Sequence, residues 1–257
     1  MLTLNDLRLA VLIDADNIPY SNVKGMLEEI AKYGTPTFKR IYGDWTKPTV
    51  AGWKSVLLEN AITPVQQYSY TRGKNSTDSA MIIEAMDILY SGKVDGFCIV
   101  SSDSDFTRLA TRLREAGMKV IGIGERKTPH PFIVACDKFI YLEIITSSTT
   151  APDQVPDTRK TGKPVVKKKK TEEIARLAAT NIVKRLIASS ITDLADENGW
   201  AYLGDVGNLI LKKQPDFDPR NFGFQKLTPL IRSLDFEIDE RDSGQNHIKH
   251  IYIRNRK

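Results

Sequence analysis

The 257-residue sequence predicts an α/β fold in which helices cover both faces of a parallel β-sheet, followed by a small winged-helix domain. In the first 145 residues, short apolar runs rich in β-branched and aromatic residues alternate with helix-like segments. Runs such as Leu9–Ile13 and Gly96–Val100 are apolar without alternation, which is typical of strands that are buried on both sides. After residue 172, three helical segments precede two alternating strands, which is the order of a winged helix.

Strands and helices are expected to alternate along the first domain. The strands are expected at Leu9–Ile13, Thr37–Tyr42, Ile62–Tyr68, Gly96–Val100, Lys119–Ile123 and Phe139–Leu142. The helices are expected at Asn22–Tyr33, Thr49–Asn60, Ser76–Tyr90, Phe106–Ala116 and Pro131–Cys136. In parallel sheets of this kind the ligand binds beyond the carboxyl ends of the strands, so the residues that follow each strand are the first candidates for a site.

The positive charge is concentrated between the two domains. Residues 1–145 carry 17 basic and 17 acidic side chains, and residues 172–257 carry 13 of each. The net charge of +5 therefore belongs to residues 146–171, which also contain prolines and no aromatic residue. This composition predicts a disordered basic linker that attracts polyanions such as nucleic acids without reading their sequence. The alternative is a spacer that only keeps the domains apart and soluble.

The composition argues against several other classes of protein. No apolar run approaches the roughly 18 residues of a membrane helix, and Leu9–Ile13 is too short for the core of a signal peptide. Cys98 and Cys136 are far apart among apolar neighbours, so reduced thiols and a cytoplasmic location are expected. Because His130 is the only histidine of the first domain, a zinc cage is excluded there. Any metal would be held by carboxylates, which suits Mg²⁺ or Mn²⁺.

Aspartates from three segments are expected at the carboxyl edge of the sheet. Asp14 ends the first strand, Asp103 and Asp105 follow the fourth, and Asp78 opens a helix on its core-facing side. Residues i and i+2 of an extended segment point the same way, so Asp14 with Asp16, and Asp103 with Asp105, each present two carboxylates to one place. Each aspartate alone is compatible with a helix cap or a turn. Together they would repel one another, and a divalent cation would relieve that repulsion.

Three motifs in this order resemble the NYN domains of the PIN-like nuclease superfamily, in particular the bacterial LabA-like group. They are residues 11–17 (Val-Leu-Ile-Asp-Ala-Asp-Asn), residues 74–78 at the head of a helix, and residues 101–106 (Ser-Ser-Asp-Ser-Asp-Phe). The resemblance covers about residues 7–145 and implies a PIN-like sheet and metal-dependent cleavage of RNA. It implies that the catalytic and metal-binding acids are Asp14, Asp78, Asp103 and Asp105.

The same resemblance bears on further polar residues. Asn17 would be a polar residue of the site, with Asp16 beside it, and Glu84 matches a position that is often acidic in the family. The alternative for Glu84 is a solvated or salt-bridged surface position. Cationic side chains in the expected loops are candidates for contacts with RNA phosphates: Lys47, Arg72, Lys74 and Lys127. Aromatic side chains after strand ends would either stack on bases or pack within their loops: Trp45, Tyr68 and Tyr70.

The second domain resembles the OST-HTH/LOTUS family at Gly199-Trp200-Ala201, at residues 215–218 and at residues 222–224. The family implies either RNA binding or docking to a protein partner, and both stay open. Because acidic and basic side chains balance in this domain, it is a poor general binder of phosphates. Its best candidates for contacts with RNA are Lys226, Arg232 and Lys249.

The sequence therefore predicts a metal-dependent ribonuclease, expected to be an endonuclease acting on single-stranded RNA, with a C-terminal module that targets RNA or a partner. Another Mg²⁺-dependent phosphohydrolase is the second hypothesis, but a phosphatase would have a threonine near Asp16, and a Toprim-type site would have a glutamate in place of Asp14. A non-catalytic RNA-binding adaptor is the third. The four intact acids argue against it, because unpaired like charges cost stability.

Overall fold

The computed structural model describes residues 6–46, 52–68, 76–149, 181–242 and 249–256. Most of the expected basic linker, residues 150–171, lies outside this range. The chain divides into two units, Met1–Thr150 and Ala151–Lys257, and each is described by itself. Among the described residues, no helix combines the length and the apolar character that a membrane span requires.

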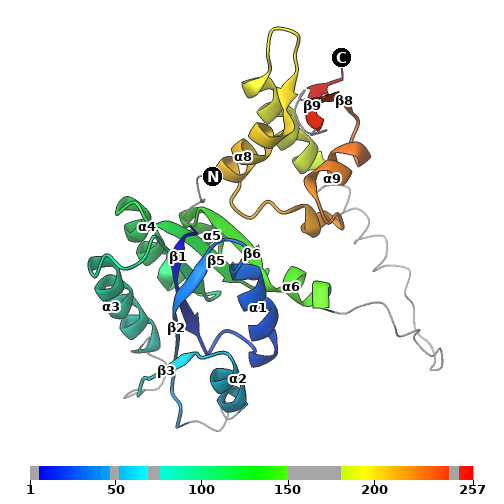
Figure 1. The fold of residues 1–257 in the computed structure, drawn as a ribbon. Coiled ribbons are helices and arrows are strands. Elements are labelled where there is room, and N and C mark those ends of the chain that lie inside the picture. The colour runs from blue at the N-terminus through cyan, green and yellow to red at the C-terminus, as the bar shows by residue number, and fades with distance from the viewer. Residues whose placement is uncertain (1–5, 47–51, 69–75, 150–180, 243–248, 257) are drawn as a thin grey trace, which may run out of the picture. The chain divides into compact units, whose positions relative to one another are not determined.

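The first unit contains a six-stranded sheet in which neighbouring strands are parallel (Figure 1). The order across the sheet is β3-β2-β1-β4-β5-β6. The strands are β1 (Arg8–Asp14), β2 (Thr35–Gly43), β3 (Thr63–Gln66), β4 (Gly96–Val100), β5 (Lys119–Gly124) and β6 (Lys138–Tyr141). The chain adds β2 and β3 on one side of β1, then returns to add β4 on the other. In open sheets of this type, ligands bind beyond the carboxyl ends of the two strands at this reversal.

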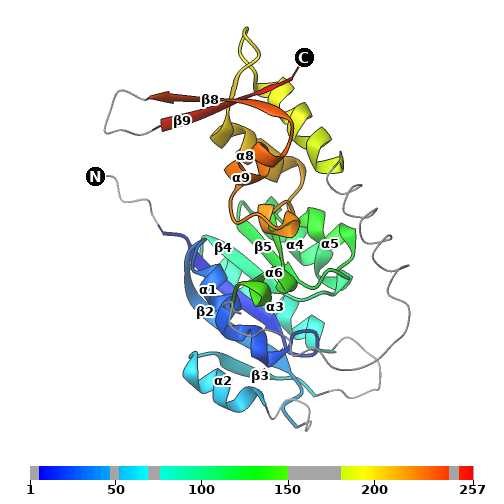
Figure 2. The ribbon, with the colours of Figure 1, turned by 90° about the vertical axis from the view of Figure 1, so that its right-hand side faces the viewer.

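The described helices cover both faces of the sheet (Figures 1 and 2). One face carries α1 (Val23–Ile30), α2 (Trp53–Glu59) and α6 (Leu142–Thr149). The other face carries α3 (Ser76–Tyr90), α4 (Thr107–Glu115) and α5 (His130–Ala135). Along β1, Leu9, Val11 and Ile13 pack with the first group, whereas Ala10 and Leu12 pack with the second. Burial on both faces explains the continuous apolar runs Leu9–Ile13 in β1 and Gly96–Val100 in β4, and the predicted fold is confirmed.

The expected strands and helices of the first unit agree with the structure to within a few residues, with two informative differences. β3 has only four residues and lies at an edge of the sheet, where Pro64 lacks the N–H that a paired strand would donate. The sequence does not predict α6, because its first residue, Leu142, looks like the end of an apolar strand.

The second unit packs helices against a small antiparallel sheet, as predicted for a winged helix (Figure 2). Residues 181–194 are helical. They are followed by β7 (Ala201–Tyr202), α8 (Leu203–Lys213), the 3₁₀ helix η4 (Pro219–Phe222), α9 (Leu227–Ser233), β8 (Phe236–Asp242) and β9 (Lys249–Asn255). The sheet order is β7-β9-β8, so the expected hairpin gains a third strand that the sequence does not predict.

Candidate metal centre

Asp14 is the last residue of β1 and is only 1% exposed. Because side chains alternate along a strand, Asp14 lies on the same face of the sheet as Leu12, the face that α3 covers. Its Oδ1 accepts a hydrogen bond from the main-chain N–H of Asp16 at 3.1 Å. Its Oδ2 accepts from Nδ2 of Asn17 at 2.5 Å and from the hydroxyl of Ser101 at 2.9 Å. Three donors therefore fix the orientation of this buried carboxylate.

Ser101, directly after β4, links the acidic segments of the two central strands. Its hydroxyl donates to Asp14 and accepts from the main-chain N–H of Asp103 at 3.1 Å. Asp103 precedes the 3₁₀ helix η3 (Ser104–Phe106), and its Oδ1 accepts from the N–H of Asp105 at 2.9 Å, so it is a helix cap. Sequence reasoning does not single out Ser101, although its place two residues before Asp103 in an extended segment puts both on one side of the chain.

Asp78, Asp103 and Asp105 offer carboxylate oxygens that all lie within 4.8 Å of one another. We call these three residues the acidic cluster. Asp78 reaches the other two because α3 packs against β1 and β2 and begins at the carboxyl edge of the sheet. One turn farther along α3, Met81 is fully buried, which fixes the face that Asp78 shares. The structure thus brings together carboxylates from two segments, beside the buried carboxylate of Asp14.

Burial and neighbouring negative charges raise the pKa of two carboxyl groups at this edge of the sheet, Asp14 and Asp78. Burial, followed by the negative charges of Asp14, Asp103, Asp105 and Asp16, raises the pKa of Asp78 to about 6. Burial also raises the pKa of Asp14, although its hydrogen bonds to Asn17, Ser101 and Asp16 act in the opposite direction. Without a cation, repulsion between these carboxylates therefore lowers the free energy of unfolding of the protein.

The donors of the acidic cluster fit Mg²⁺ or Mn²⁺. Oxygen ligands on opposite sides of Mg²⁺ lie about 4.2 Å apart, because each metal–oxygen distance is about 2.1 Å. About 4.2 Å is therefore the largest separation of two oxygens on one ion, and the carboxylate oxygens of the acidic cluster, all within 4.8 Å of one another, are close to that limit. Carboxylates are hard donors of the kind that these cations prefer over imidazole or thiolate.

Glu84 lies away from the acidic cluster. It follows Asp78 by six residues on α3, which is about 9 Å along the helix axis at 1.5 Å per residue. There it forms an ion pair with Arg40 of β2, so the structure shows the salt-bridged position that the sequence left open. The second carboxylate oxygen of Glu84 and the hydroxyl of Tyr42 are buried without a hydrogen-bond partner among the described residues.

Of the cations suggested as RNA contacts, Lys47, Arg72 and Lys74 lie outside the described residues. Lys127 is 66% exposed and pairs with Glu125 at 2.6 Å. In the second unit, Lys226 is exposed immediately before α9. Arg232 pairs with Glu240 at 2.5 Å, and Lys249 is the first residue of β9. Of these cations, Lys127 and Arg232 are neutralised by neighbouring carboxylates.

The aromatic residues suggested for base stacking differ in accessibility. Tyr68 is 56% exposed just after β3, as a stacking residue would be. Trp45 is partly buried against the core, and its indole N–H donates to the carbonyl oxygen of Val65 at 3.0 Å. Its position is therefore that of a packed loop residue. Tyr70 lies outside the described residues.

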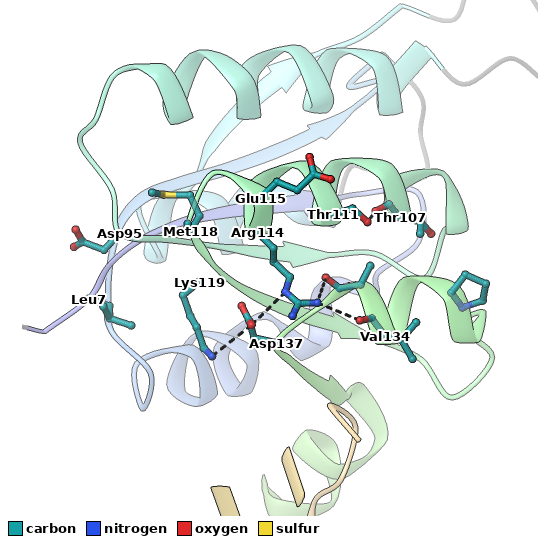
Figure 3. A pocket seen from close by; sticks show the side chains of 13 residues that line it. Leu7, Asp95, Thr107, Thr111, Arg114, Glu115, Met118, Lys119, Val134 and Asp137 are labelled. Carbon is teal, nitrogen blue, oxygen red and sulfur yellow. Dashed lines mark hydrogen bonds and ion pairs between the residues drawn. The ribbon is translucent and has the colours of Figure 1, made fainter. Parts of the chain in front are cut away.

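A surface pocket lies at the opposite, amino-terminal edge of the sheet, beside the starts of β4, β5 and β6 (Figure 3). Three of its charged side chains, Arg114, Lys119 and Asp137, interact with one another. Arg114 pairs with Asp137 at 3.3 Å and donates to the main-chain oxygens of Val134 and Ala135. Lys119 lies 3.8 Å from the same Asp137 carboxylate. This pocket does not contain the converging acids, so the acidic cluster is the better candidate site.

Two family models match the chain, one in each of its two units. The family model of the NYN domain matches residues 8–143, and that of the OST-HTH/LOTUS domain matches residues 175–248. A Vibrio parahaemolyticus protein of unknown function is 20% identical, over 54% of this chain and 94% of its own, with a TM-score of 0.44. An uncharacterized protein from Nitrosomonas europaea is 24% identical, over 42% of this chain and 90% of its own, with a TM-score of 0.27. A Chromobacterium violaceum protein is 35% identical, over 29% of this chain and 79% of its own, with a TM-score of 0.25. No curated protein matches the chain.

Proposed function

Because the chain belongs to the NYN domain family, whose model spans residues 8–143, we propose that it is a metal-dependent ribonuclease. The NYN domain is part of the PIN-like nuclease superfamily, and the OST-HTH/LOTUS domain suggests an RNA partner. The observation that carries the proposal is the convergence of Asp78, Asp103 and Asp105 at the reversal point of the sheet. In parallel sheets of this type, ligands bind beyond the carboxyl ends of the strands at this reversal.

In this proposal Asp78, Asp103 and Asp105 hold Mg²⁺ or Mn²⁺, and Asp14 adds the fourth negative charge beside them. Such an ion supplies an activated water molecule and stabilises charge on the phosphoryl oxygens. Asn17 and Ser101 keep the Asp14 carboxylate from turning away. Asp14 is buried whereas Asp105 is exposed, so the cluster is open to solvent on the side from which a phosphodiester would approach.

The second unit would serve as the targeting module of the enzyme, and single-stranded RNA is the substrate we favour. The acidic and basic side chains of the second unit balance, so this unit is not expected to bind RNA mainly through phosphates. Lys226, immediately before α9, would add one contact to an RNA phosphate. Docking of a protein partner to this unit is the competing role.

The proposal is tested by incubating the full chain with end-labelled RNA and DNA, each single- or double-stranded, with Mg²⁺, Mn²⁺ or EDTA. We expect single-stranded RNA to be cut at internal positions with either metal, and no cutting in EDTA. The variant Asp103→Asn should give no product, whereas Asp87→Asn, exposed on α3, should cleave as the original chain does. Equal cleavage in EDTA, or full activity of Asp103→Asn, would contradict the proposal.

A further inference from the structure

The outer face of the small sheet in the second unit gathers aromatic rings and arginines. In the register of this sheet Tyr202 lies opposite Tyr252, and Tyr252 lies opposite Asp239. Side chains one position away, such as Ile253, are buried in the core, so these three point to the other side. We call this surface the aromatic face and define it by six residues: Trp200, Tyr202, Arg241, His250, Tyr252 and Arg254.

The rings of the aromatic face form a connected group. The Tyr202 ring lies 5.8 Å from that of Tyr252 and 5.4 Å from that of His250, measured between ring centroids. Tyr202 is 39% exposed, although a ring of this size gains stability by burial. It also packs over Gly204, where a Cβ atom would come within 2.6 Å of the ring. The lack of a side chain at position 204 therefore leaves room for the ring in this position.

Two arginines extend the group as planar surfaces. The guanidinium of Arg241 lies 4.2 Å from the ring centroid of Tyr252, and that of Arg254 lies 4.6 Å from Trp200. Each arginine is neutralised by a carboxylate: Arg241 pairs with Asp239 at 2.8 Å, and Arg254 pairs with Glu237. These arginines are therefore better suited to present a flat face than to bind a phosphate.

We propose that the aromatic face binds the unpaired bases of single-stranded RNA by stacking. This inference rests on the proposed function in taking RNA as the ligand. Aromatic rings and guanidinium planes are the groups on which proteins stack unpaired bases, and each stacked base contributes about 1–3 kcal/mol. The balanced charge of the unit and its neutralised arginines both favour bases over phosphates as the groups recognised.

The test measures binding of the full chain, in EDTA, to an unstructured RNA that carries 2-aminopurine. The fluorescence of this base is expected to fall on binding, because stacking on an aromatic ring quenches it. Tyr202→Ala should weaken binding by roughly 5-fold to 150-fold, the range for one stacked base. Tyr202→Phe keeps the ring and should bind like the original chain. Tyr90→Ala removes a ring that is 73% exposed on α3 and serves as the control.

Salt dependence separates stacking from phosphate binding. Tyr202→Ala neutralises no phosphate contact, so the slope of log K against log salt should stay unchanged. Arg241→Lys keeps the charge and loses the plane, so it should weaken binding with the same slope.

Affinity of Tyr202→Ala within twofold of the original chain, together with unquenched 2-aminopurine, would overturn the inference and favour docking of a protein. Equal loss in Tyr202→Phe would also overturn it, because the ring would then not be the binding group. Binding in EDTA is measured without cleavage. A failure here therefore leaves the proposed ribonuclease activity standing, and loss of that activity leaves this result standing.

Discussion

Replacing Asp78 by Asn is expected to stabilise the protein in the absence of metal. The side chain is 9% exposed, and burial and neighbouring carboxylates raise its pKa from 3.8 to about 6. The folded state therefore binds the Asp78 proton more tightly than the unfolded chain does, and stability falls as the pH rises from about 4 to about 6. One pKa unit corresponds to about 1.4 kcal/mol, so ionised Asp78 costs at most about 3 kcal/mol above pH 6.

Asn does not ionise, so the variant lacks this destabilisation. We expect Asp78→Asn to be about 1–3 kcal/mol more stable than the original chain at pH 7.5 in EDTA, which raises Tm by roughly 2–10 °C. At pH 4 the difference should largely vanish, because Asp78 is then protonated in the folded state. The assay is thermal unfolding at both pH values, with Asp87→Asn on the exposed side of α3 as the control.

Adding Mn²⁺ should reverse the order. The original chain should gain stability by binding the ion, whereas Asp78→Asn has lost one of the ligands and should gain less. A Tm of Asp78→Asn below that of the original chain, in EDTA at pH 7.5, would contradict this prediction. A gain of the same size at pH 4 would also refute it, since the effect would then not be electrostatic.

The remaining predictions concern the helix cap Asp103, the hydrogen bond from Ser101 to Asp14, and the lysines 167–170 of the basic linker. Asp103→Asn should abolish cleavage but keep the Tm of the original chain without metal, because Asn also caps η3. Asp103→Ala removes the cap, so its free energy of unfolding, measured in urea, should be lower by about 1 kcal/mol. Ser101→Ala should cost about 1–3 kcal/mol in the same assay, because buried Asp14 loses a donor, with exposed Ser104→Ala as the control. Changing Lys167–Lys170 to Ala should flatten the slope of log K against log salt for single-stranded RNA by about 2.8, that is, four phosphates at roughly 0.7 each. An unchanged slope would make the tract a spacer only.

Much of the fold follows from the sequence because the sheet is buried on both faces. That burial makes strands such as Gly96–Val100 continuously apolar, and the predicted bounds of β4 and α3 coincide with the observed ones. The placement of Asp14 and Asp103 at one edge likewise follows from the rule that parallel strands share their carboxyl ends. These features depend on local pattern and on a general rule of topology.

Other features depend on contacts between distant segments, which periodicity does not reveal. Glu84 meets Arg40 only because α3 crosses β2, and the sequence gives no sign of that crossing point. Tyr202 and Tyr252 are fifty residues apart and become neighbours through the register of β7 on β9. The carboxylate of Asp103 both caps η3 and belongs to the acidic cluster. A role as a helix cap and a role as a metal ligand are therefore compatible for one aspartate.

The most direct test of the central claim is cleavage of an end-labelled, single-stranded RNA as a function of Mn²⁺ concentration. We expect no product in EDTA, a cleavage rate that rises and saturates with Mn²⁺ concentration, and no product from Asp103→Asn at any Mn²⁺ concentration. The saturating concentration should match the Mn²⁺ affinity measured by calorimetry on the same chain, because the acidic cluster holds the ion. A rate that does not depend on Mn²⁺, or an active Asp103→Asn, would contradict the assignment of the acidic cluster as a metal-dependent ribonuclease centre.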